Sequence, residues 1–294
     1  MFRTRLPAIL SIILDLVTDN QALLGDPLYL GLRQQRSSEA EMEEFIDESF
    51  MEMALMFPRH WCKLEDFSSG RAFSYSSRFC PRLPLIDDDV QCIGAVVLAG
   101  LLSAALLLPL APKDHWFLFY GTDSDGVGVA KQTSPVLSSP QHLLGFSTIK
   151  GGSTETVICH MASRTPRLIT FPFSIPSRFS ERTSAEALRT SGGSVIFASV
   201  SHFQGRTFGA CKWEPGQTNN TYILPGLALS TILCCASSVT GSMVVASVLG
   251  LTKCLTWAER AFELIRSRIA RIRDINAHVA AHVIRAAQAA ASWL

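Results

Sequence analysis

The sequence contains few charged residues. Only 17% of its 294 residues are Asp, Glu, Lys or Arg, against roughly 25% in a typical soluble domain. Between Pro215 and Thr252 there is no charged side chain. The net charge is +1, and no strongly basic segment of the kind that binds nucleic acid is present. The composition therefore predicts a chain that lies partly in lipid and does not bind nucleic acid.

Three kinds of site lack their usual sequence signals. The eight cysteines include no Cys-x-x-Cys pair, so neither a zinc site nor a disulfide framework is expected. No phosphate-binding glycine loop is recognisable, because Gly151-Gly152 and Gly192-Gly193 are typical of turns. His278 and His282 are four residues apart on a predicted helix but have no third ligand. We therefore expect no metal and no cofactor.

Two long apolar runs are present instead. Residues 90–112 lie between an Asp87-Asp88-Asp89 run and Lys113, and residues 222–252 are followed by Lys253 and several arginines. Each run is long enough to cross a bilayer as a helix, and the basic flank would place the C-terminus in the cytoplasm. A buried helix remains an alternative for the first run, and a re-entrant hairpin for the second. We expect an intracellular, endoplasmic reticulum-like membrane and lipid partners.

The rest of the chain divides around these two runs. Residues 1–89 are predicted to form an acidic helical region and a linker, with a helix over 37–56 in which Ser38 and Glu41 have capping-box spacing. This acidic helix is a candidate surface for a basic protein partner. Residues 113–221 alternate β-prone runs with Gly, Ser and Pro, which predicts a β-rich domain. Within it we expect strands over 167–171 and 194–201 and a short helix over 184–189.

Residues 253–294 have the pattern of one long basic helix. Its apolar residues are spaced alternately three and four apart, as in a heptad repeat, and a lone Asn in such a repeat can fix the register and the oligomer. The predicted self-association or membrane residues are Phe262, Ile265, Ile269, Ile272, Asn276, Val279 and Val283. An amphipathic helix lying in the headgroup plane fits the same pattern. The predicted fold class is α+β: a small β-rich domain flanked by transmembrane helices and a long C-terminal amphipathic or coiled-coil helix.

His115 begins an aromatic run, His-Trp-Phe-Leu-Phe-Tyr-Gly, and Cys211 follows later, ahead of the second apolar run. This order resembles the H-box His and the later Cys of the lecithin:retinol acyltransferase-like family of permuted papain-like thiol enzymes. Related modules occur in some picornavirus and calicivirus nonstructural proteins. The resemblance implies that the His115 imidazole activates a Cys211 thiolate. The family's Asn-Cys signature is absent here.

Three functions are therefore expected. The first is a non-enzymatic, membrane-anchored protein that scaffolds or remodels intracellular membranes, as a viral nonstructural protein of a replication complex, and forms a homo-oligomer through its C-terminal helix. The second is a membrane-anchored thiol acyltransferase or hydrolase that uses His115 and Cys211. The third is a cellular adaptor whose acidic N-terminal helix recruits a partner.

Overall fold

A computed structural model gives the arrangement of most of the chain. The described residues are 10–34, 36–57, 61–109, 117–121, 124–133, 142–146, 151–163, 165–173, 180–201, 203–209 and 211–290. The chain divides into two compact units, Met1–His60 and Trp61–Leu294. Each unit is described by itself.

The first unit contains two helices, α1 (Gln21–Gly25) and α2 (Glu39–Met56). The Ser38 side chain accepts the backbone N–H of Glu41, and the Glu41 side chain accepts the backbone N–H of Ser38. The predicted capping box and the helix that follows it are therefore confirmed.

The second unit is built on a five-stranded sheet, in the order β3-β4-β5-β6-β9, in which every strand pairs parallel to its neighbour. The strands are β3 (Phe117–Tyr120), β4 (His142–Gly145), β5 (Ile169–Pro172), β6 (Ile196–Ser199) and β9 (Gly216–Gln217). Helices connect successive strands: α5 (Ser124–Thr133), α6 (Glu155–Ala162) and α7 (Ser184–Thr190). The predicted strands over 167–171 and 194–201 and the helix over 184–189 are present, but they belong to an α/β unit.

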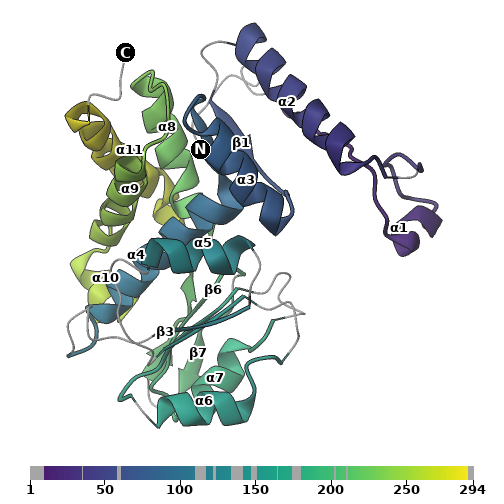
Figure 1. Cartoon of the computed structure of the whole chain (residues 1–294). Coiled ribbons are helices and arrows are strands. Elements are labelled where there is room, and N and C mark those ends of the chain that lie inside the picture. The colour runs from purple at the N-terminus through teal and green to yellow at the C-terminus, as the bar shows by residue number, and fades with distance from the viewer. Residues whose placement is uncertain are drawn as a thin grey trace. The chain divides into compact units, whose positions relative to one another are not determined.

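Both faces of this sheet are covered by helices (Figure 1). Leu144 and Phe146 belong to the large core that includes helix α4 (Ile93–Ala105), whereas Leu143 belongs to a smaller core with α6 and α7 residues such as Ile158 and Leu188. Successive residues of β4 therefore point into different cores, and all four are buried. A parallel sheet buried on both faces has apolar strands without polar alternation. The expected small β-rich domain is wrong for this reason.

The first apolar run is a core helix. The segment Asp88–Ala105 is long and apolar enough to span a membrane, but 83% of it is buried inside the protein. It comprises a π-helical turn, η2 (Asp88–Cys92), followed by α4. The α4 helix packs against α5 and against α9 (Gly241–Lys253). Lipid and a protein core select the same side chains, so the sequence alone did not separate them.

The second apolar run is two helices, α8 (Leu224–Leu233) and α9, separated by a turn that includes Cys235 at φ 49°. Both pack against α11 (Ile272–Ala289). A Cβ atom added at Gly226 would lie 2.8 Å from the carbonyl oxygen of Asn276. The small residues of this run thus let three helices of one chain pack closely, and the flanking transmembrane helices of the predicted fold are wrong.

The C-terminal region is not one continuous helix. Helix α10 (Trp257–Ala261) ends in a turn with Glu263 at φ 54°, and a short turn, η6 (Ile269–Arg271), precedes α11. Of the seven predicted self-association residues, Ile265, Asn276, Val279 and Val283 are buried within the chain, Ile272 is partly buried, and Phe262 and Ile269 are exposed. The predicted long coiled-coil helix is wrong, because an amphipathic helix that packs on its own core has the same spacing.

Asn276 has a role within the chain. Its Oδ1 accepts the backbone N–H of Gly226 at 2.9 Å, and its Nδ2 donates to the carbonyl oxygens of Thr221 and Ile272 at 3.2 and 2.9 Å. The side chain thereby ties α11 to the start of α8. A buried amide with all these partners fixes how two helices pack without a second copy of the chain.

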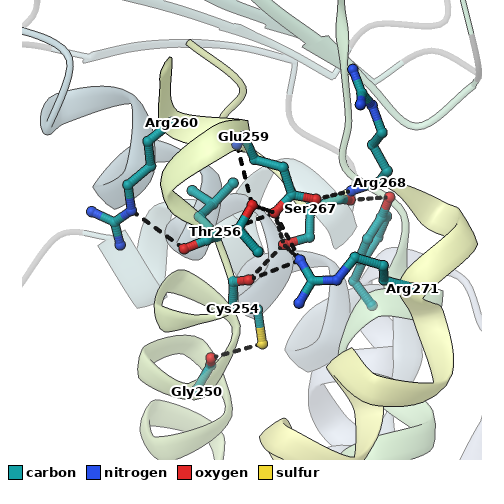
Figure 2. A network of polar contacts seen from close by, with 10 residues as sticks. Gly250, Cys254, Thr256, Glu259, Arg260, Ser267, Arg268 and Arg271 are labelled. Carbon is teal, nitrogen blue, oxygen red and sulfur yellow. Dashed lines mark hydrogen bonds and ion pairs between the residues drawn. The ribbon is translucent and has the colours of Figure 1, made fainter. Parts of the chain in front are cut away.

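A network of polar contacts centred on Glu259 joins α9, α10 and η6 (Figure 2). The Glu259 carboxylate accepts hydrogen bonds from the Thr256 backbone and hydroxyl, the Ser267 hydroxyl, the Arg268 backbone N–H and the Arg271 guanidinium. Burial alone would raise the pKa of Glu259, but these hydrogen bonds outweigh it and lower the pKa to about 2. The carboxylate is therefore fully ionised and holds the turn that precedes α11.

Candidate functional site

Carboxylates gather where two parallel strands end. Strand β1 (Cys62–Leu64) pairs with β2 (Leu85–Asp87), with Leu64 opposite Asp87. Glu65 and Asp66 follow the first strand, and Asp88 and Asp89 follow the second. The carboxyl ends of neighbouring parallel strands lie at one edge, where α/β proteins bind ligands. We call Glu65, Asp66, Asp87, Asp88 and Asp89 the acidic cluster.

Asp88 is the central residue of this cluster. The Lys63 ammonium lies 3.1 Å from Asp88 Oδ2 and also contacts the Glu65 carboxylate. Asn220 Nδ2 donates a hydrogen bond to the same Asp88 oxygen. Asn220 begins the short turn η5 (Asn220–Tyr222), three residues beyond β9. The last strand of the large sheet is thereby connected to the acidic cluster.

One oxygen of Asp88 has no partner. The residue is 1% exposed, and its Oδ1 has no hydrogen-bond partner within the described structure. A buried carboxylate oxygen without a partner is costly. Native proteins satisfy nearly all such atoms, and this is the only carboxylate oxygen among the unpartnered buried side-chain atoms of the described residues.

The pKa values of two members of the acidic cluster, Asp87 and Asp89, are raised. Burial raises the pKa of Asp87 to about 6, and its neighbours Asp89 and Asp88 add to the effect against the hydrogen bond from Val90. Burial and then Asp88 also raise the pKa of Asp89. Burial is the first cause of both raised pKa values and the neighbouring carboxylates add to it, so this edge holds several acidic groups that are partly withdrawn from water.

Local conformation supports a functional role for this edge. Asp66 has φ 62°, a left-handed conformation that is uncommon for residues other than glycine. Asp87 caps the π-helical turn through a 2.8 Å hydrogen bond from the Val90 N–H to its carboxylate. Strained residues and π-helical turns both occur preferentially at functional sites.

A second feature adjoins the acidic cluster. Strand β3 leads through Gly121, at φ 117°, into helix α5. A strand, a glycine turn and a helix in this order form the layout of a dinucleotide-binding unit. A Cβ atom added at Gly128 would lie 2.6 Å from the carbonyl oxygen of Val90, so α5 packs directly on the backbone of η2.

No three His, Cys, Asp or Glu side chains in the described part of the chain are arranged to hold a metal ion. The Lys63 ammonium lies against both Glu65 and Asp88. Carboxylate oxygens are the ligands that hard divalent cations prefer. The acidic cluster therefore has the chemistry for such a cation, but binding at Asp88 would require Lys63 to move.

Of the two residues predicted for a thiol enzyme, only the backbone of Cys211 lies within the part of the chain that the structure describes. His115 lies outside the described residues. Cys211 begins β8 (Cys211–Trp213), which forms an antiparallel hairpin with β7 (Arg206–Phe208), so it does not begin a helix. The rings of His278 and His282 are 4.6 Å apart on α11.

The central residues of the acidic cluster could not be recognised from their local sequence. Asp87, Asp88 and Asp89 were interpreted as the polar border of a membrane span. Asn219-Asn220-Thr221 has the pattern of a glycosylation sequon, which gives no sign of a contact with the acidic cluster. The available signal was an Asp run directly before a buried helix, but a functional interpretation needed the contact with Asn220, 132 positions away.

Comparison with known proteins identifies the family. The family model described as "Malic enzyme, NAD binding domain" matches residues 135–288, which is more than half of the chain. The model described as "Malic enzyme, N-terminal domain" matches residues 6–80. The acidic cluster from Asp87 onward, β3 and the whole of α5 lie between the two matched ranges.

Individual relatives agree with the family models. NADP-dependent malic enzyme 3 of Arabidopsis thaliana is 30% identical, with 94% of this chain and 56% of that protein covered. The mitochondrial NAD-dependent malic enzyme of Ascaris suum is 24% identical, over 94% of this chain and 51% of that protein. The chain thus spans about half the length of these relatives.

Solved structures show the same fold. The malic enzyme from Pyrococcus horikoshii superposes with a TM-score of 0.67 at 17% identity, covering 90% of this chain and 67% of that chain. The malic enzyme of Entamoeba histolytica gives a TM-score of 0.65 at 16% identity, covering 84% of this chain and 58% of that chain. At these identities the likeness concerns the fold.

These findings overturn several expectations from the sequence. The resemblance to the lecithin:retinol acyltransferase-like family is wrong, and so are the acyltransferase, the viral membrane scaffold and the coiled-coil oligomer. The expected membrane location, lipid partners and basic partner of the acidic helix are wrong as well, since the apolar runs are core helices of this fold. The chain belongs to the malic enzyme family.

Proposed function

We propose that the chain binds a four-carbon dicarboxylate of the malate class, together with a divalent cation, at the acidic cluster. Malate is the compound that gives the chain's relatives their names. The observation that carries the proposal is the unpartnered, buried Asp88 Oδ1 beside Lys63 and Asn220.

Charge requires the cation. Among the described residues, the five carboxyl groups of the acidic cluster have one ammonium, that of Lys63, in contact with them. A dicarboxylate that approached them would meet strong repulsion. A divalent cation at Asp88 Oδ1 would remove the repulsion and satisfy the orphaned oxygen. When bound, it supplies a positive charge that attracts the substrate carboxylate and polarises the oxygen on carbon 2.

The residues of the chain have separate roles in this proposal. Asp88 contributes the oxygen that faces the cation. Asn220 donates to the other oxygen and keeps the carboxylate oriented. Lys63, released from Asp88, donates its N–H groups to a carboxylate of the ligand, for which an ammonium is well suited.

The proposal is tested by calorimetric titration of the full chain with L-malate, with and without Mn²⁺. Binding is expected only with Mn²⁺, with a dissociation constant within about 1 μM to 1 mM, the range usual for enzyme substrates. Succinate, which lacks the hydroxyl group, should bind more weakly. Asp88→Asn should abolish the Mn²⁺-dependent binding.

The matched control is Asp274→Asn, which neutralises an exposed carboxylate on α11. It should bind like the wild type. Urea unfolding of each variant shows whether it is folded. Malate binding that does not depend on Mn²⁺, or that survives Asp88→Asn in a folded protein, would overturn the proposal.

A further inference from the structure

We infer that this chain takes its organic acid without a nicotinamide dinucleotide, because the residues at the strand ends where a dinucleotide would bind do not have the chemistry to hold it. The inference rests on the proposed organic-acid site and defines what that site works with. Three features at the carboxyl ends of β3, β4 and β5 carry it.

A dinucleotide-binding sheet has recognisable requirements. The turn after the first strand follows the pattern Gly-x-Gly-x-x-Gly, in which the second glycine lets the pyrophosphate approach the backbone. About 20 residues on, an acidic residue binds the ribose hydroxyls, or an Arg accommodates a 2′-phosphate. The ligand lies in the crevice beyond the strand ends.

The turn departs from this pattern in its sequence. It begins correctly with Gly121 and has Gly126 at the third position, but Asp123 stands where the second glycine belongs. A carboxylate there would repel the pyrophosphate. The match to the NAD-binding family model begins only at residue 135, beyond this turn.

The end of the second strand is apolar. Phe146 follows β4 directly, and its backbone N–H bonds to the Tyr120 carbonyl oxygen. Phe173 follows β5 in the same way and bonds to the Gly145 carbonyl oxygen. The two rings are stacked, with centroids 5.0 Å apart and planes 9° apart, and each residue is 3% exposed. A buried phenylalanine pair therefore occupies the strand ends where ribose recognition needs a polar group.

A carboxylate does reach the end of β4, but it is enclosed. A Cβ atom added at Gly145 would overlap the Glu181 carboxylate. Glu181 is 0% exposed and accepts a hydrogen bond from the Ser153 hydroxyl at 3.1 Å. It fills the space beside Gly145 from within the protein and is not presented to a ligand.

The three features act together on different parts of one ligand. The sequence replaces the second glycine of the pyrophosphate pattern with Asp123. Phe146 offers no acceptor to the ribose, and the buried Glu181 fills the space beside Gly145. The acidic cluster at β1 and β2 is made of other residues and is unaffected. Without a bound hydride acceptor, any turnover at that cluster would be non-oxidative.

The test measures binding of NADH and NADPH to the full chain by calorimetry and by the change in nicotinamide fluorescence. Wild type should show no saturable binding up to about 1 mM, the upper end of the usual range. The double variant Asp123→Gly/Phe146→Asp should bind NADH saturably, with a dissociation constant about tenfold or more below that limit of about 1 mM. Phe208→Asp, at an exposed position of the β7 hairpin, is the matched control and should gain nothing.

Saturable binding of either dinucleotide to the wild type would overturn the inference. If the folded double variant fails to bind a dinucleotide, Asp123 and Phe146 are not the residues that prevent binding, and that part of the inference is overturned. Asp123→Gly alone keeps the aromatic stack intact and serves as a second variant in case the double variant does not fold. The Mn²⁺-dependent malate titration is read separately, so failure of the organic-acid site and failure of this inference give different results.

Discussion

Glu259 and Asp88 are both nearly buried, but they differ in how their carboxylate oxygens are hydrogen-bonded. Glu259 accepts hydrogen bonds at both oxygens, from side chains and backbone N–H groups of α10 and η6. Asp88 contacts Lys63 and Asn220 through one oxygen, and its other oxygen is buried without a hydrogen-bond partner among the described residues. Both oxygens of Glu259 have hydrogen-bond partners within the chain, so we call this carboxylate complete and give it a structural role. One oxygen of Asp88 has no such partner among the described residues, so we call this carboxylate incomplete and propose that it binds a ligand.

The largest expected effect is on the complete carboxylate. Glu259→Gln removes the charge that Arg271 and the backbone N–H of Arg268 face. The free energy of unfolding should fall by about 2–3 kcal/mol, because hydrogen bonds to a buried charged group are among the stronger ones. Urea denaturation at pH 7 measures the loss. Glu263→Gln, at a carboxylate paired on the surface with Arg167, is the control and should have a much smaller effect.

The same contrast can be sharpened by pH. The folded pKa of Glu259, about 2, lies below its ordinary value of 4.5. Its contribution is therefore fully present above pH 4.5 and is lost as the pH falls from 4.5 towards 2. Urea midpoints measured between pH 6 and pH 3 should fall more steeply for wild type than for Glu259→Gln. Parallel curves would show that this carboxylate is not specially stabilised.

Substitution of Asp88, the incomplete carboxylate, should change ligand binding and have little effect on stability. Asp88→Asn removes one charge from a crowded cluster and leaves an oxygen for Lys63 and Asn220. Without ligands the unfolding free energy should change by about 1 kcal/mol or less, since relief of repulsion among the carboxylates offsets the weaker contacts with Lys63 and Asn220. Mn²⁺ should raise the melting temperature of the wild type and leave that of Asp88→Asn unchanged. A large loss of stability with an unchanged Mn²⁺ effect would make Asp88 structural, like Glu259.

The smallest effect is expected at a pair that resembles neither carboxylate. Arg268 and Glu214 form an ion pair with an N–O distance of 3.0 Å, and about half of each side chain is exposed. Glu214→Gln should leave the urea midpoint unchanged within error, because exposed pairs contribute little. A clear shift would show that burial is not what separates the two carboxylates.

Part of this fold could be predicted from local sequence. The Ser38–Glu41 capping box, the helix that follows it, and the short helix near Ser184 depend on contacts within one or two turns. The strands at Ile169 and Ile196 were also found, because runs of β-branched and aromatic residues favour strands.

What could not be predicted depended on long-range pairing. The apolar residues of α4 fit lipid as well as they fit a core, and only packing against α5 and α9 separates the two. The run from Phe262 to Val283 has heptad spacing, but Glu263 breaks the helix at positive φ and Asn276 is satisfied by Gly226 within the chain. The candidate site was invisible for the same reason, since Lys63, Asp88 and Asn220 meet only in three dimensions.

The close approach of Gly128 to Val90 has a mechanical consequence. With no side chain between them, the helix that follows the glycine turn rests on the very backbone that carries Asp88 and Asp89. A shift of either segment must be passed to the other, since neither has soft side chains to absorb it. Binding of a ligand at the acidic cluster should therefore shift the carboxyl ends of β3 and β4. A substitution at those strand ends should in turn change the affinity of the acidic cluster for the organic acid.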